Sequence, residues 1–171
     1  MDLFHSLAFD SSIQANFFET FARQQQIAQA RLHRNMDYQL SAFETHDDTR
    51  GRLVVFLKEP ELVDEYKRFG QIYFITFSDV GVIRGNHYHK FWREWFGIVH
   101  GKVEVVLEDV RTKQRETFTL DASKEGYLRL ETGPYVAHAF RSLTPTAALL
   151  NYANTKWNDH DTFTYTLLNN P

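Results

Sequence analysis

Residues 81–94 read Gly81-Val82-Ile83-Arg84-Gly85-Asn86-His87-Tyr88-His89-Lys90-Phe91-Trp92-Arg93-Glu94, and they bring three potential metal ligands close together. His87 and His89 are two residues apart, so on a β-strand both side chains leave the same face. Glu94 opens the next apolar run, and His138 lies in a later strand-like run. Three imidazoles and one carboxylate suit Zn(II), Fe(II), Mn(II) or Ni(II). The spacing therefore predicts a metal site on a β scaffold.

The bulk composition describes a globular chain that is rich in aromatic residues. The 171 residues are 43% hydrophobic and 15% aromatic, which favours sheet over helix and supplies a sizeable core. The net charge is −3, so no basic field points to nucleic acid or acidic membranes. There is no cysteine for disulfide or thiolate chemistry. No apolar run approaches a membrane span of about 18 residues, and the N-terminus lacks a signal-peptide pattern. We therefore expect a cytoplasmic protein with no nucleic-acid or membrane partner.

Residues 1–42 differ from the rest of the chain. Their apolar residues fall on one face at helical spacing, at Ile13, Phe17, Phe21, Ala28 and Leu32. We interpret this segment as an N-terminal helical extension that packs on its own domain or on a partner subunit. The alternative is a helix that recruits another protein.

Residues 43–168 show a β pattern instead. About ten short apolar runs follow one another, separated by turn residues, at 53–57, 72–77, 82–89, 95–99, 103–107, 117–120, 127–130, 136–140, 147–152 and 163–167. No long helical pattern interrupts the series, so an antiparallel sandwich or jelly roll is expected. The predicted fold is all-β, a single domain with an N-terminal helical extension.

The glycines that flank the histidines complete a known pattern. Gly81, five residues, His87, one residue, His89, four residues, Glu94, six residues and Gly101 together resemble the first cupin motif, with every fixed position filled. The second cupin motif is less complete, because only Gly126 and His138 match it. The resemblance implies a double-stranded β-helix, the jelly-roll barrel of cupins. It also implies a divalent metal held by His87, His89, Glu94 and His138, with zinc favoured and iron, manganese or nickel as alternatives.

Neighbouring residues narrow the resemblance. The run Arg84-Gly85-Asn86-His87 is similar to the Arg-Gly-x-His of the dTDP-4-dehydrorhamnose 3,5-epimerase family, and 137–140 resembles that family's Ala-His-Gly-Phe. A closer likeness is the C-terminal cupin half of the bifunctional reductase/epimerases of capsular-polysaccharide synthesis. This resemblance implies an epimerase or isomerase for a nucleotide-linked 4-keto sugar in cell-surface polysaccharide biosynthesis, acting as a homodimer.

The resemblance also implies roles for single residues. His87 takes the position of the catalytic base and Tyr152 that of the acid, whereas Arg84 and His138 line the substrate site. On a regular strand Arg84 would face away from His87, so both can face one site only if a β-bulge lies near Gly85. His87 is thus a candidate for two duties, because a nitrogen bound to metal cannot also accept a proton.

Two other function classes remain open at this stage. The same ligand set serves an Fe or Mn cupin that acts as an oxygenase or isomerase on another small molecule. A non-catalytic cupin that binds a ligand as a sensor or assembly module is the other alternative.

Overall fold

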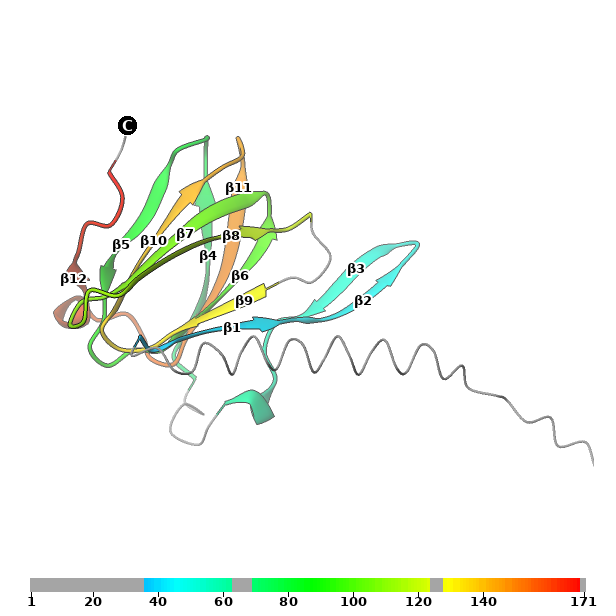
Figure 1. Cartoon of the computed structure of the whole chain (residues 1–171). Coiled ribbons are helices and arrows are strands. Elements are labelled where there is room, and N and C mark those ends of the chain that lie inside the picture. The colour runs from blue at the N-terminus through cyan, green and yellow to red at the C-terminus, as the bar shows by residue number, and fades with distance from the viewer. Residues whose placement is uncertain (1–35, 63–68, 124–127, 170–171) are drawn as a thin grey trace, which may run out of the picture. The chain divides into compact units, whose positions relative to one another are not determined.

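The computed structural model describes residues 36–62, 69–123 and 128–169, which form an all-β unit (Figure 1). Within these ranges the chain forms twelve strands and two short 3-10 helices, η1 (Glu59–Glu61) and η3 (Asp159–Asp161). None of the helices that the structure describes is long and apolar enough to cross a membrane. The expected helix with Ile13 to Leu32 lies outside the described residues.

Two antiparallel five-stranded sheets make up the fold. The first has the order β1 (Tyr38–Ala42), β9 (Leu128–Thr132), β6 (Glu94–His100), β11 (Ala147–Ala153) and β4 (Gln71–Phe77). The second has the order β12 (Phe163–Thr164), β5 (Ile83–Tyr88), β10 (Val136–Ser142), β7 (Lys102–Asp109) and β8 (Arg115–Asp121). A separate hairpin joins β2 (Glu44–Asp48) to β3 (Gly51–Val55). This is the antiparallel sandwich of a cupin, as the sequence pattern predicts.

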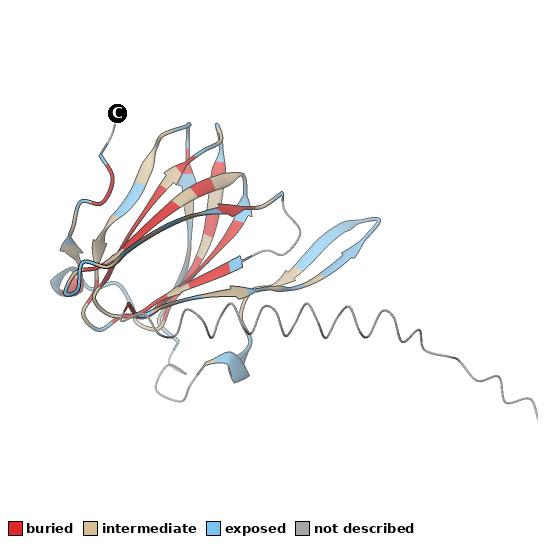
Figure 2. Ribbon diagram, viewed as in Figure 1, coloured by how far each residue is buried: buried red, intermediate tan, exposed pale blue. Residues whose placement is uncertain are grey.

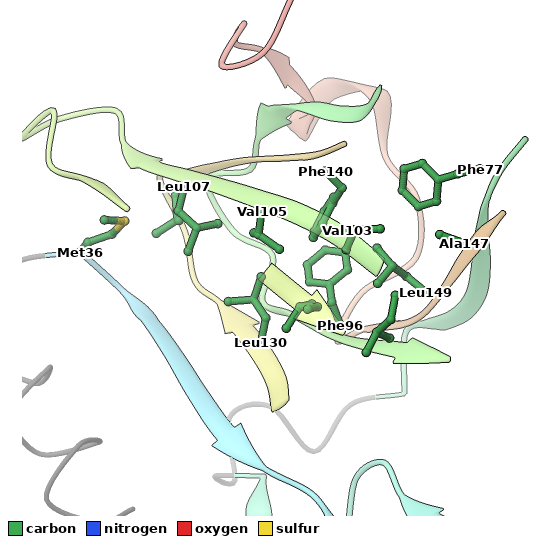
Figure 3. Packing of buried hydrophobic residues seen from close by; sticks show 13 residues of the cluster. Met36, Phe77, Phe96, Val103, Val105, Leu107, Leu130, Phe140, Ala147 and Leu149 are labelled. Atoms are coloured by element: carbon green, nitrogen blue, oxygen red, sulfur yellow. The ribbon is translucent and has the colours of Figure 1, made fainter. Parts of the chain in front are cut away.

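The core lies between the two sheets because each strand alternates its side chains. Val103, Val105 and Leu107 of β7 point inward and are fully buried, and they belong to one cluster with Leu130 and Leu149 of the first sheet (Figure 3). Buried positions therefore recur along both sheets, whereas the β2–β3 hairpin is largely exposed (Figure 2).

Strand β10 is buried on both faces. Its inward side chains join the main core, but Ala137 and Ala139 point outward, where Leu167 and Leu168 cover them. We call residues 163–168 the C-terminal strap. Phe163–Thr164 form β12 at the edge of the second sheet, and Leu167 and Leu168 cover its outer face.

A strand precedes the segment in which the sequence analysis recognises a β pattern. Tyr38–Ala42, which the sequence analysis assigns to the helical extension, form strand β1 and pair with β9. Tyr38 and Leu40 both pack against the core, so their spacing is the period of two of a strand and not the helical period. The compact unit that holds the sheets starts at Arg34.

Candidate active site and metal centre

The four predicted metal ligands meet at one end of the barrel. His87 lies near the end of β5, and His89 directly follows that strand. Glu94 is the first residue of β6, and His138 lies on β10. One ligand atom from each lies within 4.8 Å of all the others. Both the Nε2 of His89, at 3.5 Å, and the Nε2 of His138, at 3.4 Å, approach the same oxygen, Oε2 of Glu94. The convergence that the sequence spacing predicts is therefore present.

A β-bulge in β5 turns both Arg84 and His87 toward the same side. His87 lies opposite His138, but Gly85 lies opposite the next residue of β10, so Asn86 is an extra residue in the ladder. Because of this extra residue, Arg84 and His87 share a face although they are three positions apart. The bulge near Gly85 is the one that the sequence analysis requires.

Each histidine of the cluster is oriented by a contact with a backbone group. Nδ1 of His89 lies 2.6 Å from the backbone oxygen of Asp161, and Nδ1 of His138 lies 3.4 Å from that of Val136. His87 makes a hydrogen bond with the backbone of Gly85. A ring nitrogen that donates to a carbonyl leaves the other nitrogen with a free lone pair, which is how metal-binding histidines are usually held.

Burial keeps the histidines neutral. It lowers the pKa of His89 to about 4, that of His138 well below its usual value, and that of His87 in the same direction. Burial also raises the pKa of Glu94 to about 7, although hydrogen bonds from Tyr73 and Asn151 oppose this rise. Burial thus disfavours the charged carboxylate of Glu94. A divalent ion would stabilise this carboxylate and accept the lone pairs of the neutral imidazoles.

The donor atoms fit a divalent ion. Among the described residues, Nε2 of His89 and Oε2 of Glu94 are buried polar atoms without a hydrogen-bond partner, and they face each other. Ligands about 2.1 Å from a tetrahedral ion lie about 3.4 Å apart, which matches the two separations around Glu94. The residues present therefore suit the metal that the cupin resemblance implies.

A cleft of about 480 Å³ opens above this cluster. His87 and His138 form part of its wall, Arg84 lies at its exposed side and Tyr73 of β4 lines it. The hydroxyl of Tyr73 donates to Oε1 of Glu94 at 3.1 Å. The cleft thus joins a neutral imidazole, a cationic guanidinium and a phenol over a buried carboxylate.

The sequence places this unit in a known family. Residues 36–166 match the family model described as FdtA, WxcM-like, C-terminal. The chain belongs to the FdtA family. No curated protein is close enough in sequence to count as a match.

Solved structures with the same fold as this FdtA-family chain include two 3,4-ketoisomerases and a 3'-monoepimerase. A 3,4-ketoisomerase from Helicobacter canadensis is 26% identical with a TM-score of 0.63, and the match covers 75% of this chain and 91% of that one. ChmJ, a 3'-monoepimerase from Streptomyces bikiniensis in complex with dTDP-quinovose, is 20% identical with a TM-score of 0.69, covering 79% and 73%. QdtA, a sugar 3,4-ketoisomerase from Thermoanaerobacterium thermosaccharolyticum in complex with TDP, is 21% identical with a TM-score of 0.64, covering 76% and 89%.

Tyr152, the acid that the resemblance implies, lines a different hollow of the FdtA-family barrel from the cleft of His87. Its neighbour Asn151 points inward and donates to Oε1 of Glu94 at 3.3 Å, so Tyr152 leaves the opposite face of β11. There its ring packs on Trp95, with ring centroids 5.2 Å apart, and lines a different hollow. Because side chains alternate along a strand, a shift by one residue places a tyrosine on the opposite side of the sheet.

Two residues that support the site were not recognised from the sequence. Tyr73 is opposite Asn151 in the β4–β11 ladder, so both side chains reach Glu94 from the first sheet. Asp161 is buried, and its carboxylate accepts from the backbone N–H of Lys90 at 3.0 Å and of Phe91 at 3.1 Å. No local signal marks either residue, because 72–75 are all apolar or aromatic and do not alternate in the sequence.

Proposed function

We propose that this FdtA-family chain is an epimerase or isomerase that acts on a nucleotide-linked 4-keto sugar in cell-surface polysaccharide biosynthesis. The observation that carries the proposal is the cleft in which His87, Arg84 and Tyr73 lie above the cluster of His89, Glu94 and His138. The ketoisomerases and the monoepimerase with the same fold support it.

The residues of the cleft suit proton transfer beside a carbonyl group. A 4-keto sugar has an acidic C–H next to its carbonyl, and epimerisation or ketone migration starts with loss of that proton. Burial lowers the pKa of His87, so its imidazole is neutral at pH 7 and can accept the proton. Burial raises the pKa of Tyr73, so its phenol keeps a proton that it can return. We assign the base to His87 and the acid to Tyr73.

We further propose that His89, Glu94 and His138 hold a divalent ion, with zinc favoured. Catalytic zinc sites commonly have three protein ligands and one open position. When bound, the ion would supply a Lewis acid for the oxygen of the enolate. His87 belongs to the same cluster but is less buried than His89 and His138, so we assign it the base and not a fourth ligand.

Arg84 suits the nucleotide part of the substrate. It is exposed at the cleft and shares the face of His87, and a planar guanidinium binds diphosphate oxygens in pairs. His138 lines the cleft as well, so the ion site adjoins the bound sugar.

We also propose that the protein is a cytoplasmic homodimer. The outer face of the first sheet exposes Ile72 and Phe74 of β4 and Val99 of β6, each by more than half of its surface. Exposed apolar side chains of this size are typical of an interface between subunits. Sedimentation of the purified full chain should give twice the monomer mass.

The proposed reaction is tested by solvent exchange. The protein is incubated in deuterated water with dTDP-4-keto-6-deoxyglucose and with other 4-keto sugar nucleotides, and deuterium incorporation is followed by mass spectrometry. Deuterium should appear at the carbon beside the carbonyl. Absence of exchange with every such substrate would sink the proposal, and substrate-dependent oxygen consumption by iron-loaded protein would favour the oxygenase alternative.

Replacement of the buried carboxylate should separate metal binding from folding. In Glu94→Gln the amide keeps the size of the side chain but is a poor zinc ligand, so we expect zinc affinity to fall at least about 100-fold. The metal-stripped variant should unfold at the same temperature as stripped wild type or higher, because a buried carboxylate no longer has to be desolvated.

Competition with a chromogenic chelator and thermal unfolding measure these two effects. Asp79→Asn, which changes an exposed carboxylate, is the control and should leave both unchanged. Zinc affinity that is equal in Glu94→Gln and wild type would remove Glu94 from the ligand set.

A further inference from the structure

The bulge that turns Arg84 and His87 into the cleft has an unusual backbone. Two successive residues of β5 have positive φ angles, +87° at Gly85 and +58° at Asn86. Gly85 also lies so close to β10 that an added Cβ would be 2.6 Å from the backbone oxygen of His138. A strand does not adopt this conformation by itself, so neighbouring groups must hold it.

The side chain of Asn86 connects the bulge to the C-terminal strap. Its Oδ1 accepts from the backbone N–H of Leu167 at 2.9 Å and of Leu168 at 3.1 Å, and its Nδ2 donates to the backbone oxygen of Leu168 at 2.8 Å. The backbone oxygen of Asn86 accepts from the N–H of Tyr165 at 2.7 Å. One amide therefore satisfies three backbone groups that lie 81 and 82 positions further along the chain.

The strap itself is firmly attached to the sheet. Leu167 and Leu168 pack in the outer cluster with Ala137 and Ala139 of β10. Nη2 of Arg115 on β8 donates to the backbone oxygen of Leu167 at 3.0 Å. Leu167 and Leu168 are thus held by β8 and β10, whereas Phe163 and Thr164 pair with β5 itself, and Asn86 connects the bulge to Leu167 and Leu168.

We propose that Asn86 is a positioning residue, which through the strap holds the bulge that brings Arg84 and His87 to one face. Without this connection β5 can pair with β10 in regular register, and a shift by one residue reverses which side chains face the cleft. Arg84 or His87 then points away from the substrate. The metal ligands Glu94 and His138 lie on other strands, and His89 is held by the backbone oxygen of Asp161, so all three keep their places. The inference rests on the proposed function only for the roles of Arg84 and His87.

Three substitutions distinguish this role from a merely conformational one. Glycine adopts positive φ more easily than asparagine, so Asn86→Gly keeps the backbone conformation available but removes the side-chain contacts. Asn86→Asp keeps both acceptor bonds from the strap and loses the donor bond. Asn86→Ala loses all three and is strained as well. If Asn86 holds the bulge, function should decrease from wild type to Asn86→Asp and then to Asn86→Gly and Asn86→Ala. If only a positive φ angle is needed at this position, Asn86→Gly should function as well as wild type.

The first measurement is binding of thymidine diphosphate to the full-length protein by calorimetry. Asn86→Gly should bind about tenfold more weakly than wild type and Asn86→Asp only about two- to threefold more weakly, because hydrogen bonds of this kind each contribute modestly. In deuterium exchange into the 4-keto sugar, KM should rise more than kcat falls, since Arg84, which we assign to the nucleotide part, leaves the cleft. Zinc content should remain that of wild type, which a general loss of structure would not allow.

The second measurement is the crystal structure of Asn86→Gly. We expect residue 86 of this variant to pair with β10 in regular register, and we expect Arg84 to leave the cleft. If Asn86→Gly binds thymidine diphosphate within about twofold of wild type, or if its structure keeps the bulge unchanged, the inference is overturned. A wild-type protein without exchange activity would refute the proposed function instead, and the crystal structure would still decide the role of Asn86.

Discussion

Replacing His87 by alanine should lower the rate of C–H exchange by about 10²- to 10⁴-fold while zinc stays bound. A positioned general base contributes about that factor, and the alanine removes it. His89, Glu94 and His138 remain, and the separations of 3.5 Å and 3.4 Å around Glu94 do not depend on His87. Exchange rates from mass spectrometry and zinc content from elemental analysis check the two halves of this prediction.

The matched control is His100→Ala. His100 is exposed at the far end of β6 from Glu94, so its loss should change neither quantity. If His87→Ala instead loses its zinc together with its activity, His87 is the fourth ligand, and the proton must be removed by another group.

The placement of His87 and His89 could be predicted from the sequence because it is local, whereas the cupin resemblance was needed to join Glu94 and His138 to them as ligands. His87 and His89 share a strand face by parity, and Tyr88 between them packs into the outer cluster instead. The need for a bulge between Arg84 and His87 followed from the same parity, and the structure has it at Asn86. Local periodicity also identified the all-β fold.

The remainder of the site depends on pairings between distant strands. Tyr73 reaches Glu94 only because β4 lies beside β11, a pairing that no short sequence pattern specifies. The backbone oxygen of Asp161 supports His89 from a segment 72 residues away along the chain. Likewise the first strand, Tyr38–Ala42, was assigned to the helix because its partner β9 lies about 90 residues later. Long-range register therefore decides which tyrosine and which aspartate serve the site.

Replacing Tyr73 by phenylalanine should lower product formation by about 100-fold, whereas Tyr152→Phe should stay within about twofold of wild type. The Tyr73 hydroxyl lies in the cleft, 3.1 Å from Oε1 of Glu94, and burial raises its pKa so that it retains its proton. Tyr152 is on the outer face of β11 against Trp95. The two variants remove the same atom from two sides of one sheet, so each is the control for the other.

The form of the defect in Tyr73→Phe tests its assigned step. If Tyr73 returns the proton on the face opposite His87, its loss leaves proton removal intact. Recovered substrate should then still gain deuterium from the solvent, while the epimerised or isomerised product nearly disappears, so the ratio of exchanged substrate to product rises. Loss of both in parallel would make Tyr73 a support for Glu94 and not the acid. A large defect in Tyr152→Phe with none in Tyr73→Phe would mean that the parity of β11 in solution is the reverse of the one described, because only then would Asn151 and Tyr152 exchange faces.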